Sequence, residues 1–386
     1  MLCFFLFCSF FLSFAQLTVG AERTELYIDF LKDKNVAVCA NQTSVVGDQH
    51  LIDTLLSRGI KITKIFCVEH GFRGDKEAGA KIVSSIDEKT GIPLISLYGN
   101  AKKPTKQQLV DVDVVLFDIQ DVGCRFYTYI STLHYLMEAV AENEKGMCIL
   151  DRPNPNGFLV DGPMLDPKYR SFVGMHPVPI AHGMTIGEYA LFINGEKLLA
   201  NGICCPLQIV EVENWRHSQR YDLPISPSPN LTSYSAVVLY PTLCLFEGTA
   251  ISVGRGTEDP FTCFGHPSLK IGDYFFTPHA IKGVAENPPC NGERCRGFDL
   301  KPLANNMMMR DNMINIDLII KAYNNFPNQK EFFLKNNFFD KLAGTPLLRE
   351  QIIHHLSAEQ IRASWKSDLE NFKKIRKKYL LYPDFE

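Results

Sequence analysis

Glu69, His70 and Arg73 follow the largely apolar run 62–68 and are the first residues of this sequence that suggest chemistry. A carboxylic acid can protonate a leaving group, an imidazole can transfer a proton near neutral pH, and an arginine can bind a carboxylate through two parallel hydrogen bonds. The alternative interpretation is structural, because salt-bridged glutamates and hydrogen-bonded histidines also occur at turns. We predict a site here, with Glu69 and His70 as its titratable pair.

Polar side chains follow five such runs, at 36–40, 62–68, 94–97, 112–117 and 147–150. Short apolar runs of this kind are typical of strands that are buried on both faces of a parallel sheet. Because parallel strands end at the same edge of a sheet, we expect the residues that follow them to line one cleft. These residues are Asn41, Glu69, His70, Tyr98, Asp118, Gln120, Asp121 and Asp151.

The elements that position these residues predict an α/β fold. Helical patterns at 25–31, 52–58, 129–142 and 185–200 lie between or after the strands, which favours a Rossmann-like, doubly wound, mostly parallel sheet over residues 24–235. The length of 386 residues exceeds what one core usually supports, so we expect a smaller C-terminal α/β domain over 236–386 and an active-site cleft between the two.

The C-terminal domain is predicted to open with a buried strand at 236–240 and to end in a helix. Ser357 and Gln360 form a capping box, and apolar residues then recur at intervals of three and four from Ile361 to Tyr379. We expect that stripe to pack in the core. The basic cluster 373–378 is expected to face solvent.

Composition and motifs exclude several classes of function. The formal net charge of -3 gives no basic surface for nucleic acid, so we expect no nucleic-acid partner. The first strand is followed by NQTSVVG, which lacks the glycine pattern of dinucleotide-binding folds, and a Walker A sequence is absent. We therefore predict neither a cofactor nor a metal ion.

Residues 1–15 carry no charge and end in Ser13-Phe14-Ala15, which predicts a cleaved signal peptide and a secreted, periplasmic protein. An uncleaved anchor is the alternative; we expect no membrane span in the mature chain. Most cysteines lie in apolar runs. Cys290 and Cys295 instead flank a polar turn, where a local disulfide can form in an oxidising compartment.

A second group of candidates lies outside the strand ends. Arg255 is flanked by Gly254 and Gly256, which would let the backbone approach a ligand closely. A mobile surface loop is the alternative. Other polar candidates in this group are Arg125, Tyr127, His182, Asn230 and Glu247.

The ordered motifs of the chain resemble those of the NamZ-type exo-β-N-acetylmuramidases. The matching segments are EHGFRG (69–74), SLYG (96–99), VLFDIQDVGCRFYTYISTLHYLMEA (115–139), LDRPNPNG (150–157), VDGPML (160–165), HGMTIGE (182–188), PSPN (227–230), FEGTAISVGRGT (246–257) and FDKLAGT (339–345). The resemblance implies a glycosidase that releases terminal N-acetylmuramic acid from the non-reducing end of peptidoglycan fragments. It also implies that Glu69 of the EHG motif is the catalytic glutamate.

Roles for the other candidates follow from the chemistry of this sugar. An N-acetylated sugar can use its own acetamido oxygen as nucleophile, so a polar group need only orient the acetamide; Asp118, Asp121 and Glu247 are the candidates. The lactyl carboxylate of muramic acid suits an arginine, for which Arg73, Arg125 and Arg255 are the candidates. Tyr127 and Tyr129 either stack on a sugar ring or pack in the core.

Two other functions compete with this interpretation. A non-catalytic sugar-binding module could use the same scaffold, although the number of carboxylates at the strand ends favours an enzyme. A metal-dependent hydrolase would use His70, Asp118, Asp121 and His182, although no ligand spacing in the sequence supports it.

Overall fold

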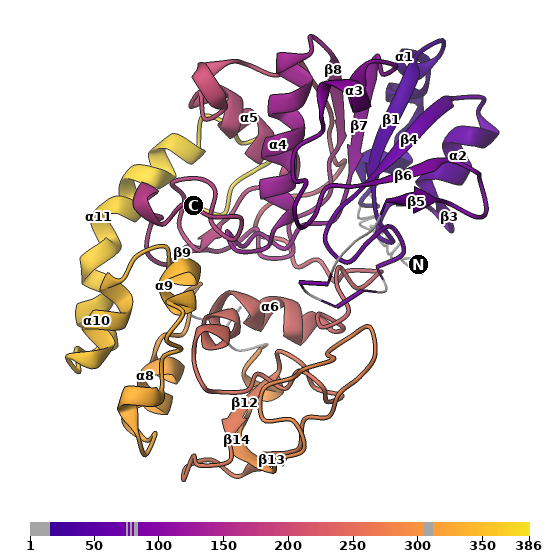
Figure 1. The fold of residues 1–386 in the computed structure, drawn as a ribbon. Helices are drawn as coiled ribbons and strands as arrows, with labels where there is room; N and C mark the ends of the chain where they lie inside the picture. The colour runs from indigo at the N-terminus through magenta and orange to yellow at the C-terminus, as the bar shows by residue number, and fades with distance from the viewer. Residues whose placement is uncertain (1–15, 75, 78, 81–83, 305–311) are drawn as a thin grey trace, which may run out of the picture.

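The computed structural model describes residues 16–74, 76–77, 79–80, 84–304 and 312–386. The predicted signal segment 1–15 lies outside these residues. A large domain carries the main sheet, and a smaller domain lies beside the lower edge of that sheet in Figure 1. Across the described residues, every helix is too short or too polar to cross a membrane.

The large domain is built on a seven-stranded sheet with the order β11-β8-β7-β1-β4-β6-β5. Each neighbouring pair is parallel except β5 with β6, which is antiparallel at the edge. The chain leaves β1 toward β4 on one side and later crosses to β7 on the other, which confirms the Rossmann-like, doubly wound prediction. The strands are β1 (Asn35–Ala40), β4 (Lys61–Cys67), β5 (Ser85–Ile86), β6 (Pro93–Ser96), β7 (Val114–Asp118), β8 (Gly146–Leu150) and β11 (Leu207–Val210).

Both faces of this sheet are covered, so successive residues of a strand are buried in two different layers. Val36 and Val38 of β1 belong to the cluster that includes α2, whereas Ala37 and Cys39 belong to the cluster that includes α4 and α5. This arrangement explains why the strands are apolar without alternation. The covering helices are α1 (Ile28–Leu31), α2 (Leu51–Ser57), α3 (Lys106–Leu109), α4 (Tyr129–Glu142) and α5 (Ile186–Gly195).

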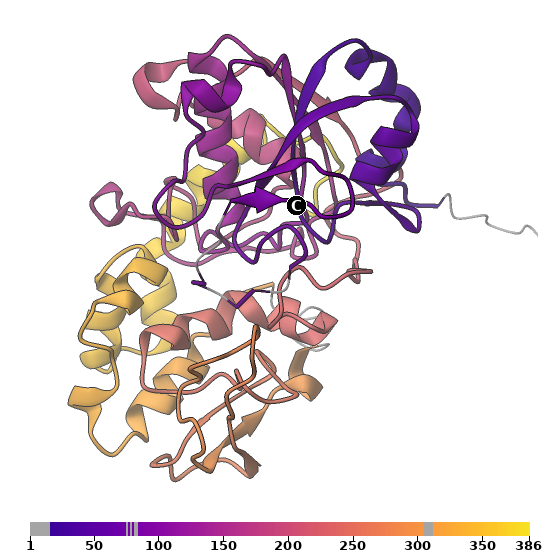
Figure 2. The same cartoon turned by 45° about the vertical axis from the view of Figure 1, so that its right-hand side comes forward.

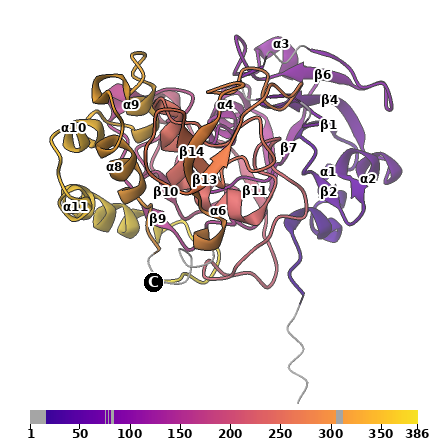
Figure 3. The same cartoon turned by 90° about the horizontal axis from the view of Figure 1, so that it is seen from below.

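The smaller domain combines a three-stranded antiparallel sheet with helices (Figures 2 and 3). Its strands are β12 (Cys263–His266), β13 (Tyr274–Phe276) and β14 (Cys295–Asp299), in the order β12-β14-β13. Its helices are α6 (Tyr234–Leu243), α8 (Asp317–Asn324), α9 (Phe338–Ala343), α10 (Leu347–Ile353) and α11 (Ala358–Arg376). Two short antiparallel pairs of the large domain are β2 (Val45–Val46) with β3 (Gln49–His50), and β9 (Val160–Asp161) with β10 (Ala181–His182).

The predicted strand at 236–240 is wrong, because this segment lies within helix α6. Ser233 caps the helix by accepting a hydrogen bond from Ala236 N at 3.2 Å. The helix is buried on every side, so its apolar residues show no helical periodicity. Pro241 cannot donate to the Val237 carbonyl, and the Asn156 side chain donates to that oxygen instead, at 3.1 Å.

The C-terminal helix is confirmed, with one correction. Ser357 and Gln360 make the predicted capping box, and Trp365 and Phe372 of the apolar stripe are buried. Arg376, however, does not face solvent with the rest of the basic cluster. It is fully buried, donates to the Gly183 carbonyl at 2.8 Å and pairs with Asp384 at 2.9 Å. The C-terminal segment thereby returns to the large domain.

Candidate active site

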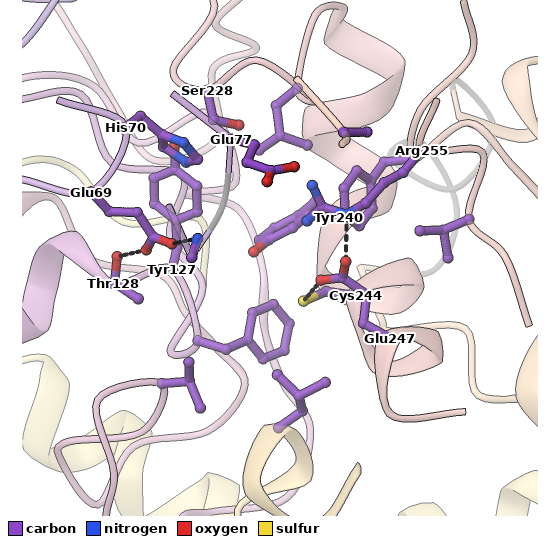
Figure 4. A pocket seen from close by; sticks show the side chains of 18 of the residues that line it. Glu69, His70, Glu77, Tyr127, Thr128, Ser228, Tyr240, Cys244, Glu247 and Arg255 are labelled. Atoms are coloured by element: carbon purple, nitrogen blue, oxygen red, sulfur yellow. Dashed lines mark hydrogen bonds and ion pairs between the residues drawn. The ribbon is translucent and has the colours of Figure 1, made fainter. Parts of the chain in front are cut away.

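A cavity of about 650 Å³ lies between the two domains. The large domain contributes the residues after β4 and β6 and those just before α4, and the small domain contributes α6, the turn around Arg255 and the segment 284–289. Figure 4 shows Glu69 on one side of this cavity and Glu247 with Arg255 on the other, with Tyr240 between them. The volume lies within the range of small-molecule sites.

The Glu69 carboxyl group is held by three donors. Oε1 accepts from the Tyr98 hydroxyl at 2.8 Å and from Gly79 N at 3.0 Å, and Oε2 accepts from the Thr128 hydroxyl at 2.5 Å. Thr128 occupies the N-cap position of α4, yet its side chain does not cap the helix, because its hydroxyl is turned toward Glu69. Glu69 is therefore oriented from three separate segments of the large domain.

His70 lines the cavity beside Glu69 and is buried. Its Nδ1 lies 2.7 Å from the Lys76 carbonyl oxygen, and its backbone has a positive φ of 70°. Burial lowers the pKa of His70 from its usual value, and the neighbouring Glu69 opposes that shift in part. A neutral ring bonded to a carbonyl through Nδ1 presents Nε2 as an acceptor.

The small domain presents Tyr240, Cys244 and Glu247 to the cavity. The spacing of four and three residues places them on one face of the helical segment formed by α6 and the 3-10 turn Cys244–Gly248. Glu247 Oε1 accepts from Arg255 Nε at 2.5 Å, and the Cys244 thiol donates to Oε2 at 3.5 Å. The second carboxylate is thus also fixed in place.

The glycines around Arg255 serve the fold of the turn. Gly254 and Gly256 both have φ of 79°, and a Cβ on Gly256 would lie 2.4 Å from the His279 carbonyl oxygen. The close approach that these glycines allow is therefore to the chain itself, to Asp259 and Cys263 at Gly254 and to the segment 279–288 at Gly256. Arg255 also lies over the Phe261 ring, with 4.9 Å between its Cζ and the ring centroid.

The structure brings part of the predicted set together. The predicted residues that line the cavity are Glu69, His70, Tyr98, Tyr127, Glu247 and Arg255. The roles proposed for them stay predictions. The other predicted residues lie outside the cavity, each for a physical reason given below.

Asp118 does not face the cavity, because it forms a buried ion pair. Its carboxylate accepts from Arg152 Nε at 2.5 Å and Nη2 at 2.9 Å, and its side chain is fully buried. Asp151 is also buried, where it accepts from the hydroxyls of Thr185 and Tyr382 and from Gly187 N. These two carboxylates hold the strand ends and the C-terminal segment together.

Asp121 and His182 form a buried pair away from the cavity. Asp121 Oδ2 accepts from Gly123 N at 2.6 Å and lies 4.0 Å from His182 Nε2. Burial raises the pKa of Asp121 to about 7 and lowers the pKa of His182 to about 3. Asp121 is not among the residues that line the cavity, so the structure does not bring it together with Glu69 and Glu247.

Three polar side chains stabilise loops near the site. Asn41 accepts from Thr43 and donates to the Tyr129 hydroxyl at 3.1 Å. Gln120 donates to the carbonyls of Asp121 and Pro153, both at 2.8 Å, and Asn230 donates to the Val284 carbonyl at 2.8 Å. Tyr129 packs edge-on against Tyr127 at 4.8 Å between ring centroids, so it is a core residue.

Two of the three arginine candidates lie outside the cavity. Arg125 is fully buried and donates to the carbonyls of Pro163, Val178 and Leu342. Arg73 is half-exposed, pairs with Asp87 at 2.8 Å and lies over the Phe72 ring outside the cavity. Arg255 is the candidate that lines the cavity.

The residues of the metal hypothesis do not converge. Asp118 is committed to Arg152, and His70 is bonded to a backbone carbonyl. Within the described ranges, no group of three or more His, Cys, Asp or Glu side chains could hold a metal ion. The geometry therefore gives the metal-dependent alternative no ligand set.

Sequence reasoning missed several residues that line the cavity. These are Glu77, Lys102, Thr128, Phe172, Ser228, Tyr240, Cys244 and Asn287. Tyr240 and Cys244 could have been found, because with Glu247 they follow helical spacing once 234–243 is taken as a helix. Thr128 carried no such signal, since a threonine before a helix normally indicates a cap. Lys102, which lies over the Phe172 ring at 4.6 Å, is a second cation in the cavity.

Comparison with known proteins agrees with this architecture. A curated peptidoglycan β-N-acetylmuramidase, NamZ of Bacillus subtilis, is 40% identical over 369 residues, which cover 91% of this chain and 88% of that protein. Two crystal structures of DUF1343 family proteins from Bacteroides fragilis superpose with TM-scores of 0.87 and 0.80. The first structure is 44% identical in sequence, and the match covers 96% of this chain and 100% of that structure. The second is 28% identical, and the match covers 95% of this chain and 99% of that structure.

Family models match the chain in two consecutive parts. The N-terminal model of the exo-β-N-acetylmuramidase NamZ matches residues 36–235, and the C-terminal model matches residues 238–382. The two matches together span most of the chain. The protein therefore belongs to the NamZ family of exo-β-N-acetylmuramidases.

Proposed function

We propose that this protein is an exo-acting glycoside hydrolase that releases terminal β-1,4-linked N-acetylmuramic acid from the non-reducing end of peptidoglycan fragments. The observation that carries the proposal is Glu69, a carboxyl group held by three donors at the edge of the inter-domain cavity of a NamZ-family chain. The relative from Bacillus subtilis is named a peptidoglycan β-N-acetylmuramidase, which supports the same substrate class.

Glu69 is the general acid and base of this proposal. Cleavage of a glycosidic bond needs a proton on the leaving oxygen, and a positioned carboxyl group can supply it. The hydroxyls of Tyr98 and Thr128 can each donate to or accept from this carboxyl group. Glu69 thus keeps hydrogen-bond partners both before and after it gives up the proton.

Glu247 is proposed to orient the acetamide in a substrate-assisted reaction. Of the carboxylates considered from sequence for this role, Asp118 and Asp121 lie outside the cavity, whereas Glu247 lines it from the small domain. Arg255 and Cys244 fix its two oxygens. A carboxylate held in this way can accept the acetamide N–H while the acetamide oxygen attacks the anomeric carbon.

Arg255 is proposed to recognise the lactyl carboxylate. Its Nε is used by Glu247, which leaves the two Nη groups as the fork that a carboxylate can bind. Its side chain is 16% exposed and lines the cavity. Charge-assisted hydrogen bonds strengthen in so poorly solvated a position.

We also propose that the chain acts after export, with residues 1–15 removed. The support is the uncharged apolar run that ends in Ser13-Phe14-Ala15. N-terminal analysis of protein collected from the periplasm of its host tests this, and recovery of the full-length chain from the membrane fraction would overturn it.

Hydrolysis of a matched pair of chromogenic glycosides tests the proposed activity. One substrate carries N-acetylmuramic acid and the other N-acetylglucosamine, on the same aryl leaving group. We expect turnover of the first and a clear preference over the second. Binding of the muramic acid glycoside without turnover would instead indicate a sugar-binding module, and preference for glucosamine would overturn the substrate assignment.

A further inference from the structure

A pair of cysteines lies next to the cavity in the small domain and takes no part in the proposed reaction. Cys290 and Cys295 flank a tight turn in which Glu293 N donates to the Cys290 carbonyl at 2.9 Å and Gly292 N donates to the Pro278 carbonyl at 2.7 Å. Cys290 is partly exposed, and Cys295 is the buried first residue of β14. Cys290 packs against the buried cluster of Cys263, Phe276 and Cys295, and both Cys290 and Cys295 are free thiols in this structure.

We propose that Cys290 and Cys295 are a redox-active dithiol whose disulfide fixes one wall of the cavity. The wall consists of Asn287, Pro288 and Pro289, which line the cavity and lead directly into Cys290. On the other side, Cys295 is anchored in the small sheet, because its strand pairs with both β12 and β13. A bond between the sulfurs would tie this wall to the sheet.

The structure distinguishes this pair from the other described cysteines. Cys39, Cys67, Cys148 and Cys205 are buried thiols whose pKa is raised by burial, which makes them unreactive. The Cys295 thiol lies 3.8 Å from the Glu293 carbonyl oxygen inside the same turn, and its hydrogen-bonding interaction with Cys290 lowers the pKa of Cys290 from its usual value. Cys290 therefore combines solvent access, a stabilised thiolate and a resolving thiol within reach.

A neighbouring thiol makes metal binding the natural alternative. Cys263 belongs to the same buried cluster as Cys295, but its thiol is directed to the Asp259 carbonyl at 3.5 Å. No candidate metal cluster of three side chains includes these residues in the described part of the chain. The geometry thus favours a two-sulfur reaction over a metal site.

The oxidation is a thiol–disulfide exchange with a small-molecule disulfide such as oxidised glutathione. The Cys290 thiolate attacks one sulfur of the oxidant, which breaks the oxidant S–S bond and releases one reduced thiolate. The Cys295 thiol then gives its proton to water or buffer and attacks the Cys290 sulfur, which releases the second thiolate. The two protein thiols lose two electrons in total, and the oxidant gains them.

The fixed wall lies against the turn that carries Arg255. A Cβ on Gly256 would come within 2.9 Å of the Pro288 side chain, and His279 N donates to the Gly256 carbonyl at 2.8 Å. Segment 279–289 therefore supports the turn from outside. Oxidation should reduce local opening of this segment more than it changes the free energy of global unfolding, because the loop that a bond between Cys290 and Cys295 would close is short.

Thiol mapping of the full mature protein tests the proposal without any activity measurement. The protein is equilibrated with oxidised glutathione, alkylated and digested. We expect one peptide that contains both cysteines and is lighter by two hydrogen atoms, while Cys204, an exposed cysteine outside the turn, is alkylated or glutathionylated. Cys295→Ser should trap glutathione on Cys290, whereas Cys290→Ser should react at Cys295 at least about tenfold more slowly.

Several outcomes would overturn the proposal. Alkylation of both Cys290 and Cys295 after oxidation, or pairing of either one with Cys263 or with a second chain, would do so. Amide exchange at 284–287, the residues that precede Pro288 and Pro289, tests the structural consequence, because these amides should exchange about tenfold or more slowly in the oxidised protein than in the reduced one. Equal exchange would show that the disulfide does not fix the wall. Cys204→Ser is the matched control and should change neither measurement.

Discussion

Arg255 is the residue on which the selectivity of the proposed enzyme should depend. The lactyl carboxylate distinguishes N-acetylmuramic acid from N-acetylglucosamine, and Arg255 faces the cavity opposite Glu69 (Figure 4). Arg255→Met keeps most of the apolar stem over Phe261 and removes the charge. Arg73→Met makes the same chemical change at an arginine that is paired with Asp87 outside the cavity, so it is the matched control.

The size of the effect follows from the strength of one charge-assisted pair. A well-formed pair of this kind contributes about 1.5 to 3 kcal/mol, which corresponds to a preference of roughly tenfold to hundredfold. The substitution also leaves Glu247 with the Cys244 thiol but without its charged partner, and that loss would affect both sugars. The double variant Glu247→Gln/Arg255→Met removes the unpaired carboxylate. The preference of this double variant for one sugar over the other therefore isolates the contribution of the arginine.

The assay is the ratio of kcat/KM for the muramic acid glycoside to that for the glucosamine glycoside. We expect the ratio to fall by roughly tenfold to hundredfold in both Arg255 variants and to stay unchanged in Arg73→Met. An unchanged ratio in the single and double Arg255 variants would refute the assignment. Lys102→Met would then test a second cation among the described residues that line the cavity.

Three further predictions concern carboxylates. Glu69→Gln should keep the melting temperature and lower kcat by about 10²- to 10⁴-fold, and near-parental turnover would remove Glu69 from the role of general acid. Asp118→Asn should lower the free energy of unfolding in urea by about 3 to 5 kcal/mol, because it leaves Arg152 buried without a charged partner. A loss of turnover without a loss of stability would contradict the assignment of Asp118 to a structural ion pair. Asp121→Asn tests the raised pKa of Asp121. Folding favours the protonated form of this carboxyl group. Its stabilising contribution is therefore present below the unfolded pKa of 3.8 and is lost as the pH rises to about 7. Between pH 4 and pH 7, the free energy of unfolding of the variant, measured in urea, should therefore rise relative to that of the parent by up to about 4 kcal/mol. A difference that stays constant with pH would show that Asp121 titrates normally.

The doubly wound sheet could be predicted because its strands are buried on both faces. Burial on both faces leaves an uninterrupted apolar run, and the run stops where the backbone reaches the sheet edge, as it does at Cys67 before Glu69. Helix α6 was missed for the same physical reason. Its surroundings are apolar in every direction, so the sequence 236–240 has the composition of a buried strand and no periodic signal.

The site was predicted less well because strand-end carboxylates have partners that the sequence does not show. Asp118 ends the buried strand β7 and Glu69 follows the buried strand β4. Asp118 meets Arg152 from the loop after β8, whereas the donors to Glu69 among the described residues are neutral, and Glu69 faces the cavity. Spacing along the chain contains no information on such a long-range pair. The same limit applies to Arg125, whose partners are three backbone carbonyls from distant segments.

The motif DRPNPN shows how residues away from the reaction still determine the geometry of the site. Asn156 donates to the Val122 carbonyl in the large domain at 2.9 Å and to the Val237 carbonyl in α6 at 3.1 Å. The Val237 carbonyl can accept from Asn156 because Pro241, four residues later in α6, has no N–H to donate to it. This one side chain therefore joins the loop after β7 to the helix that presents Tyr240 to the cavity.

Since Glu69 and Glu247 belong to different domains, their separation depends on how the domains are docked. One buried cluster runs from the sheet face under α4 into the small domain, where it includes Phe246 and Phe339, so apolar packing opposes rotation of one domain against the other. Asn156 adds a directional contact to that packing. The two carboxylates are therefore held across the cavity by packing and hydrogen bonds that lie outside it.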